Sequence, residues 1–405
     1  MKPKESGMKL YIQIICGLLL WTIGMSASAL PQFSLLTGDK CASCHVAPQG
    51  GGLRSDLGAY ARNEISLISP ESAGLGWLYA LDAKKNTLLD GQITFGMDFR
   101  LQMAKSHRTE DAEEKIFPMQ AAIYSQYAPA EWIAAEVTIN VGHKRFGNTQ
   151  TNNYPGQQPW EAAVTFRPSQ SMPSLRIGMI QPTIGIRYDD HTKITRQAPS
   201  AGGINSTGTS SIIPPLYAEY GAEISYDAPR DWTLSAGVFG SRAISEVQSS
   251  AAEGKTVSLI SDKNIPSLAL RAVYWPHIGK NFNSFAGASY FANDDFSMIN
   301  GFIGIGVNDM FSLTADYAYS DKKNIRHTQT ISLEAMFQAL ESLMLCARIE
   351  GGTSTISGKD EYTNQLVLGV QAFLLPCIEL RPEYRIMDTD NFRSGRWAAQ
   401  LHIFY

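Results

Sequence analysis

Apolar and polar residues alternate along the stretch from Gly91 to Met103. The apolar positions are Ile93, Phe95, Met97, Phe99, Leu101 and Met103, and the positions between them are Thr94, Gly96, Asp98, Arg100 and Gln102. A period of two predicts a β-strand with one apolar and one polar face. The C-terminus repeats this pattern, with Trp397, Ala399, Leu401, Ile403 and Tyr405 on the apolar face. The long C-terminal region therefore begins and ends with half-apolar strands.

About sixteen segments of this kind, each of ~10 residues, follow one another from Asp90 onward, as in a transmembrane β-barrel. They lie near 91–104, 117–128, 131–142, 159–168, 174–186, 215–227, 231–241, 266–276, 282–292, 297–307, 310–319, 328–339, 342–351, 362–375, 377–387 and 396–405. We therefore predict an all-β fold, a porin-like antiparallel transmembrane β-barrel of about sixteen strands over residues 90–405.

The connections between these segments alternate in length. Short ones are expected at Ala128-Pro129-Ala130, Ala228-Pro229-Arg230, Asn308-Asp309 and Leu340-Glu341, and long polar ones at 143–158, 187–214, 242–265 and 351–361. Outer-membrane barrels have short periplasmic turns and long extracellular loops. An even number of strands places both ends of the barrel on the tight-turn side. The alternative is a soluble all-β protein with many hairpins, in which unprotected strand edges would face water.

Composition and charge agree with either class of β protein. Hydrophobic residues make up 44% of the chain, and the mean hydropathy is −0.14. A barrel has such values because only alternate residues of each strand face lipid. The formal net charge of −4 is too small to indicate a polyanionic partner, and nucleic acid is not expected.

The first 29 residues have the order of a secretory signal peptide. Lys2, Lys4 and Lys9 precede an apolar run from Leu10 to Gly24, and Ala27-Ser28-Ala29 forms a cleavage box. The alternative is an uncleaved anchor, but the run is shorter than the ~20 residues of a transmembrane helix. The predicted mature chain begins near Leu30 and loses Cys16. Export to the bacterial outer membrane is the expected localisation.

Soon after this site the chain reads Cys41-Ala42-Ser43-Cys44-His45, the C-x-x-C-H signature of covalent c-type haem attachment. The two thiols form thioether bonds to one porphyrin, and the imidazole becomes the proximal iron ligand. We therefore predict one haem c, bound by Cys41 and Cys44 with His45 as its metal ligand. The alternatives are a Cys-Cys redox pair beside an incidental His, or half of a zinc site, which needs four ligands.

Residues 30–89 form a monohaem segment with no ordinary distal ligand, because residues 46–90 contain neither Met nor His. The distal ligand would then be an unusual residue or a barrel residue, or the site would be open. The candidates are Lys84, Lys85, Tyr60 and Asn63 in the segment, and Met344, Met336 and His402 in the barrel. Helical spacing is expected from Leu53 to Ile68. A segment this small needs shielding, so we expect a haem-bearing plug in the barrel mouth, on the periplasmic side or within the lumen.

The predicted lumen is polar. Glu379, Arg381, Glu383 and Arg385 share one strand face, and Arg348 and Glu350 share another. A ladder that guides ions or donors is one interpretation, and a mutually paired wall is the favoured one. Cys346 and Cys377 are expected on strands separated by a third, too far apart for a disulfide. The polar stretch 176–197 includes Asp189, Asp190 and His191, and the loop after it is long enough to narrow the lumen.

The string Leu30-Pro31-Gln32-Phe33-Ser34-Leu35-Leu36-Thr37-Gly38, the C-x-x-C-H box, Pro48 and Leu57-Gly58-x-Tyr60 resemble the start of the fused monohaem cytochrome–porins of iron-oxidising bacteria. The resemblance implies an outer-membrane protein that takes electrons from an extracellular donor such as ferrous iron and passes them to a periplasmic carrier. The chain departs from the family at Leu35-Leu36-Thr37-Gly38, where an Arg-Gln-Thr-Gly run is common. This departure bears on the donor more than on electron transfer.

The leading hypothesis is therefore an outer-membrane electron conduit, with a periplasmic c-type cytochrome or similar carrier, an extracellular donor or acceptor, and membrane lipid as partners. A ferrous iron oxidase activity would follow from it. The alternatives are a passive porin-like barrel with a structural haem segment and an open-site haem sensor. No Ser-His-Asp or paired-carboxylate constellation indicates a hydrolytic site.

Overall fold

The computed structural model describes the barrel and much of the N-terminal segment. The described residues are 31–47, 50, 52–55, 58, 65–79, 86–107, 113–140, 160–169, 171–186, 193–201, 203, 212–213, 217–228, 231–240, 265–276, 278–279, 281–356 and 358–405. The predicted signal peptide and its cleavage site lie outside these residues.

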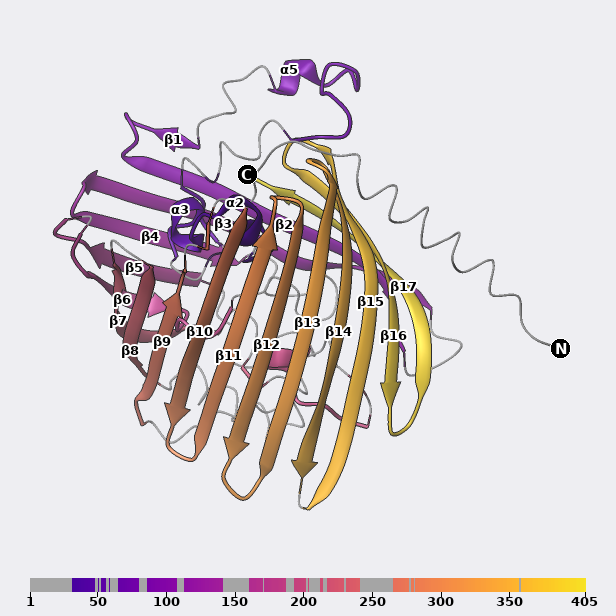
Figure 1. The fold of residues 1–405 in the computed structure, drawn as a ribbon. Helices are drawn as coiled ribbons and strands as arrows, with labels where there is room; N and C mark the ends of the chain where they lie inside the picture. Colours follow the sequence, from indigo (N-terminus) through magenta and orange to yellow (C-terminus); the bar gives the residue numbers. More distant parts are fainter. Residues whose placement is uncertain are drawn as a thin grey trace.

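Sixteen antiparallel strands form a closed barrel (Figure 1). They are β2 (Ile93–Lys105), β3 (Glu114–Ala130), β4 (Ile133–Asn140), β5 (Trp160–Phe166), β6 (Ser174–Ile180), β7 (Glu219–Asp227), β8 (Trp232–Phe239), β9 (Ser267–Tyr274), β10 (Phe282–Asn293), β11 (Phe296–Val307), β12 (Phe311–Lys322), β13 (Arg326–Leu340), β14 (Leu343–Ile356), β15 (Lys359–Leu375), β16 (Ile378–Thr389) and β17 (Arg393–Phe404). Each pairs with its sequence neighbour, and β17 pairs with β2 to close the sheet. The predicted all-β barrel and its strand number are confirmed.

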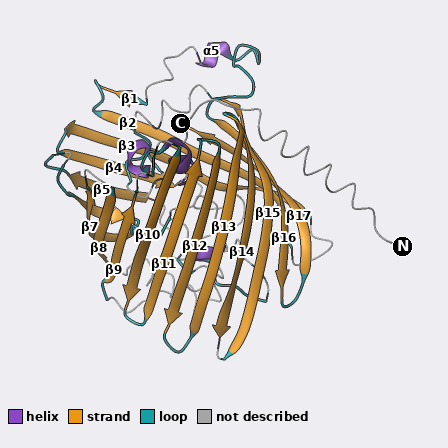
Figure 2. Cartoon of the chain, viewed as in Figure 1, coloured by secondary structure: helices purple, strands orange, loops and turns teal. Residues whose placement is uncertain are grey.

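Short elements gather at one end of the barrel (Figure 2). They are α2 (Pro31–Thr37), α3 (Cys41–Cys44), α5 (Gly76–Tyr79) and β1 (Thr87–Leu88), which adds to β2. The C-terminus lies at the same end, because Tyr405 exchanges two backbone hydrogen bonds with Met97 near the start of β2. Both ends of the barrel therefore lie on the side of the turns β3–β4, β11–β12 and β13–β14, as predicted.

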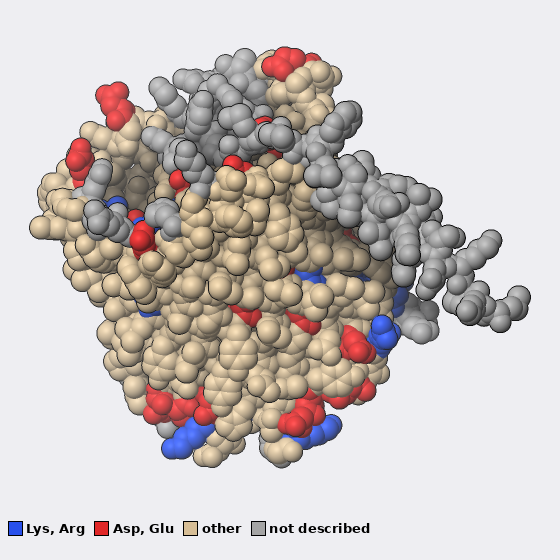
Figure 3. All heavy atoms as spheres, viewed as in Figure 1, with Lys and Arg blue, Asp and Glu red and all other residues tan. Residues whose placement is uncertain are grey.

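The outer face of the barrel is apolar and carries aromatic residues at two levels. On the turn side the exposed set is Tyr127, Trp132, Phe166, Trp232, Tyr274, Phe282 and Phe311. Towards the other end the set includes Trp160, Tyr220, Tyr290 and Tyr319. Figure 3 shows a wide, mostly uncharged wall on the visible face, with most of the charged side chains at the two ends of the barrel. An apolar band between two aromatic girdles is the outer surface of a transmembrane barrel.

Some predicted boundaries were wrong. The segment expected at 351–361 as a long loop is the end of β14, a tight turn and the start of β15, paired from Leu343 to Ile356. The strand expected at 174–186 ends at Ile180, because the next residues bond to side chains inside the barrel. The helix expected from Leu53 does not begin there, since Leu53 and Ser55 pair with the backbone of Val46 and Cys44.

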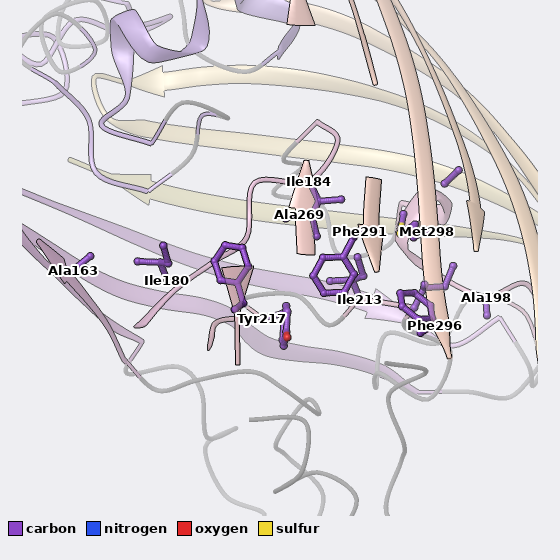
Figure 4. Close-up of a cluster of buried hydrophobic side chains, with 13 residues drawn as sticks. Ala163, Ile180, Ile184, Ala198, Ile213, Tyr217, Ala269, Phe291, Phe296 and Met298 are labelled. Atoms are coloured by element: carbon purple, nitrogen blue, oxygen red, sulfur yellow. The ribbon is translucent and has the colours of Figure 1, made fainter. Parts of the chain in front are cut away.

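The chain after β6 crosses the lumen, and we call its described residues 181–186, 193–201, 203 and 212–213 the strap. It includes the short 3-10 helix η2 (Ile194–Arg196). Ile184, Ala198, Ile212 and Ile213 of the strap share a buried cluster with barrel residues such as Phe291 and Phe296 (Figure 4). The prediction that this loop folds into the lumen is confirmed for the described residues. Asp189, Asp190 and His191 lie outside them.

Polar contacts attach the strap to strands around the barrel. Thr183 donates to Glu223 of β7 through its backbone nitrogen and its hydroxyl, at 3.0 and 2.7 Å. Ile194 N donates to Glu350 of β14 at 3.2 Å, and Lys193 forms a buried ion pair with Glu334 of β13. The strap is therefore fixed to opposite parts of the wall.

Candidate haem site at the barrel mouth

The C-x-x-C-H box forms one helical turn followed by an extended residue. Cys41 to Cys44 make α3, and His45 caps it by donating its backbone nitrogen to Cys41 O at 3.0 Å. The chain then returns across the box, because Ser55 N donates to Cys44 O and Val46 N donates to Leu53 O. The box is thus supported by a short antiparallel pairing.

Two glycines allow this close return. Gly50 has a φ of +84°, and a Cβ at Gly50 would lie 3.5 Å from Cys41 Cβ and 3.8 Å from His45 Cδ2. A Cβ at Gly58 would lie 2.1 Å from Cys44 O, which excludes any larger residue. The side chains of Cys41 and His45 therefore border the same small space at Gly50. Two thiols and a buried imidazole within five residues fit the donor set of a covalent haem.

Cys41 belongs to the part of the N-terminal segment that we call the plug, the described residues 31–47, 50, 52–55 and 58. Its Sγ is 3.4 Å from Ser34 Oγ of α2. Burial raises the pKa of the Cys41 thiol, and the hydrogen bond from Ser34 and the positive charge of Arg271 oppose that rise. The neighbouring Lys40 forms an ion pair with Asp227 at 2.7 Å at the end of β7. The box is consequently connected both to α2 and to the barrel.

Helix α2 seats against small residues on the inner face of β11. A Cβ at Gly306 would lie 1.9 Å from Leu35 O, and one at Gly304 would lie 2.8 Å from Leu35 Cδ1. Asn283 Nδ2 donates to Leu35 O at 2.8 Å. The helix ends at Thr37, and Gly38 follows it with a φ of +77°, which suits a C-terminal cap. These contacts place the predicted plug inside the mouth of the barrel.

A second face of α2 packs on the part of the wall formed by β13, β14, β15 and β17. Phe33, Leu36 and Ile65 share a buried cluster with barrel residues Met336, Met344, Phe373 and Phe404. Both methionines point inward, as the strand parity predicts, but they lie in this packed cluster. The four segment candidates for a distal ligand, Tyr60, Asn63, Lys84 and Lys85, lie outside the described residues.

His402 faces inward and is held by two carboxylates. Its Nε2 is 2.7 Å from Asp98 Oδ1, and its Nδ1 is 3.2 Å from Glu379 Oε2. Because both ring nitrogens are engaged, His402 would have to break a buried contact to bind iron. This arrangement disfavours His402 as a distal ligand. The contacts of His402 connect β17 to β2 and β16 near the point where the barrel closes.

The charged residues of the two predicted strand faces are paired with one another. Arg348 lies 3.2 Å from Glu350, and Arg385 lies 2.5 Å from Glu383. Arg381 lies between Glu379 and Glu383, at 3.5 and 3.9 Å. The favoured interpretation, a mutually paired wall, is confirmed for these residues.

Cys346 and Cys377 are thiols and both pack against the buried cluster beneath α2. Cys377 is in the turn between β15 and β16 with a φ of +63°, and so it is not on a strand as expected. Within the described part of the chain, no three His, Cys, Asp or Glu side chains are arranged to hold a metal ion.

The sequence did not point to two further side chains, one in the plug and one on the barrel wall. Arg54 of the segment stacks over the ring of Phe404 with its Cζ 4.1 Å from the centroid. Arg271 of β9 is 6% exposed and faces inward. Strand parity indicates the inward position of Arg271, but nothing in the sequence shows that the strap reaches it.

No family model and no curated protein matches the chain. Solved structures, in contrast, match the chain. A loop-deletion mutant of OmpT, an outer membrane protein of Vibrio cholerae, matches with a TM-score of 0.50 and 12% identity, covering 77% of this chain and 99% of its own. OprB of Pseudomonas putida gives a TM-score of 0.50 and 12% identity, with 78% and 95% covered. An anion-selective porin from Comamonas acidovorans gives 0.50 and 10%, with 77% and 98% covered.

At such low identity the likeness shows the fold alone. These structures cover 77% or 78% of this chain, which is close to the fraction of the chain that forms the barrel. No helix in the described residues is long and apolar enough to span a bilayer. The chain is therefore similar in fold to outer-membrane porins, with an additional N-terminal segment that carries the C-x-x-C-H box inside one mouth of the barrel.

Proposed function

We propose that this protein resides in the outer membrane and transfers electrons through one haem c held by Cys41, Cys44 and His45. The observation that carries the proposal is the position of the box. A haem-attachment signature is held inside the mouth of a closed porin-like barrel by α2 and by the Lys40–Asp227 ion pair. A purely solute-conducting pore has no need of this arrangement.

Each residue of the box has a defined role. The Cys41 and Cys44 thiols add to the two vinyl groups of one porphyrin and fix it covalently. The imidazole of His45, the residue that caps α3, would hold the iron. The haem supplies one-electron cycling between ferric and ferrous iron. The barrel keeps lipid away from the site, and α2 with Gly304 and Gly306 holds the box at a constant place.

The two ends of the barrel suit different partners. The box lies at the tight-turn end, which is periplasmic in barrels of this class. A periplasmic c-type cytochrome or similar carrier accepts the electron there. An extracellular donor such as ferrous iron would enter from the opposite end, past the strap, and a haem held by Cys41, Cys44 and His45 would supply its one-electron acceptor. The resemblance to the iron-oxidising cytochrome–porins supports this direction.

The test is a haem stain and an absorption spectrum of the purified full-length protein. We expect covalent haem on a denaturing gel and a reduced spectrum after ferrous iron is added. The His45→Ala variant is expected to change the absorption spectrum of the haem, because it removes the proposed iron ligand, while it keeps the barrel. Covalent haem that neither ferrous iron nor other outer donors reduce would refute the conduit.

The second candidate is a passive solute pore, which the likeness to an anion-selective porin favours. Planar bilayer recordings separate the two functions. We expect the strap to keep the wild-type conductance small. A large, steady conductance in a protein that carries no haem would favour the pore.

A further inference from the structure

Arg271 lies where the plug, the wall and the strap meet. It points inward from β9 and is 6% exposed. Its Nε donates to Gly185 O of the strap at 2.9 Å, and its Cζ lies 5.4 Å from the centre of the Phe302 ring. Phe302 and Leu35 of α2 belong to one buried cluster. The guanidinium is therefore adjacent to the helix whose Ser34 contacts Cys41.

The charge of Arg271 has no close counter-ion in the described part of the protein, where no carboxylate lies within salt-bridge distance of it. The Glu223 carboxylate, whose charge acts on Arg271, accepts two hydrogen bonds from Thr183. A buried cation without a partner is costly, so such a site favours an anion. The thiol of Cys41 is near enough for the charge of Arg271 to act on it.

We propose that the Arg271 guanidinium binds a carboxylate of the group attached to Cys41 and Cys44, namely a haem propionate. This inference rests on the proposed function and adds a positioning residue to it. A planar guanidinium with five N–H donors is suited to a carboxylate, and only the Nε donor is used by Gly185. The same contact would couple the haem to the strap, since Arg271 holds both.

The propionate bound in this way remains ionised and its charge is neutralised by Arg271. Loss of the guanidinium leaves an uncompensated negative charge beside the iron, which stabilises the ferric state and lowers the midpoint potential. The pKa of the propionate then rises into the working range. The midpoint potential of the variant is therefore expected to become pH-dependent.

The experiment is a redox titration of the full-length holoprotein over about pH 5 to 8, a range in which an Arg-paired carboxylate stays ionised. The variants are Arg271→Gln and Arg271→Lys, with Arg385→Gln as a control that removes another buried luminal arginine. We expect a flat profile for wild type, a lower and sloping profile for Arg271→Gln, and partial rescue by Arg271→Lys. Arg385→Gln keeps the wild-type slope.

The outcomes distinguish this inference from the proposed function. Covalent haem with the same potential and slope in Arg271→Gln as in Arg385→Gln would overturn the role of Arg271 and leave the haem intact. A wild-type protein without covalent haem would overturn both. If Arg271→Gln does not fold, the Arg271→Lys titration decides, because a potential and a slope equal to those of wild type would contradict a role that depends on the guanidinium.

Discussion

Small residues determine where the N-terminal segment docks. Gly304 and Gly306 clear the inner face of β11 for Leu35, and Gly50 and Gly58 let the chain fold back over the box. A Cβ at Gly304, Gly306 or Gly58 would collide with a neighbour, and Gly50 has a positive φ that side chains rarely adopt. Glycine weakens a strand because it has no side chain. In β11, Gly304 and Gly306 leave the space that α2 of the plug occupies.

A substitution at Gly306 tests this docking. Gly306→Val is expected to displace α2 and destabilise the docked segment by about 1–3 kcal/mol, the usual cost of overpacking. The measurement is the rate of limited proteolysis near residues 31–47 in detergent. Gly301→Val, on the same strand with open space around its Cβ, is the matched control. Equal cleavage rates for the two variants would contradict the docking.

The sequence indicates the proposed haem-binding residues of the box but not their surroundings. C-x-x-C-H is a local signal, so Cys41, Cys44 and His45 are predicted from spacing alone. Arg271 and Gly306 are separated from the box by more than 200 residues, and their proximity depends on barrel closure and on the path of the strap. His402 illustrates the same limit, because parity predicts its direction but not its two carboxylate partners.

At the scale of elements, period-two alternation predicts all sixteen strands because each strand has one lumen face and one lipid face. It predicts the ends less well. Strands β14 and β15 continue beyond the apolar belt as a polar hairpin, which resembles a loop in sequence. The strap continues the apolar pattern of β6 and yet leaves the sheet, since its apolar residues find burial inside the lumen.

The buried ion pair between Lys193 and Glu334 tests the attachment of the strap. Lys193→Met leaves Glu334 charged and without this partner, which costs about 3–5 kcal/mol for a buried pair. We expect a lower temperature for the heat-modifiable gel shift and a larger bilayer conductance. Lys193→Met combined with Glu334→Gln is expected to recover stability. A double variant no more stable than Lys193→Met would show that the pair does not hold the strap.

The connection between β2 and β3 carries a pH response. Burial and the charges of Arg385 and Arg396 lower the pKa of His107 to about 4, and its ring contacts Ser394 Oγ at 2.9 Å. The unfolded chain, with an ordinary pKa near ~6.5, binds the proton first. Stability is therefore complete above about pH 6.5 and falls as the pH drops towards 4. His107→Gln should flatten this part of the stability profile, and an unchanged profile would contradict the assignment.

The whole molecule combines a porin-like wall with two internal pieces, the plug at the tight-turn mouth and the strap across the lumen. Both are attached to the inner face by specific polar contacts. The likeness to porins is a likeness of the barrel wall, and the plug is an addition to that wall. A function based on the box therefore depends on which side of the membrane this mouth faces.

Cysteine labelling in intact cells tests that orientation. Asn324→Cys lies in the β12–β13 turn, at the end opposite the plug, and Asp309→Cys lies in the β11–β12 turn on the plug side. A membrane-impermeant maleimide is expected to label Asn324→Cys and to leave Asp309→Cys at the level of the parent. The reverse labelling would place the box outside the cell.

The most direct test of the central claim is the mass and spectrum of the purified full-length protein. We predict a mass that includes one covalently bound haem, a spectrum that ferrous iron converts from the oxidised to the reduced form, and loss of the covalent haem in Cys41→Ser/Cys44→Ser but not in Cys346→Ser. A wild-type protein whose mass includes no haem, expressed with a working haem-attachment system, would contradict the account.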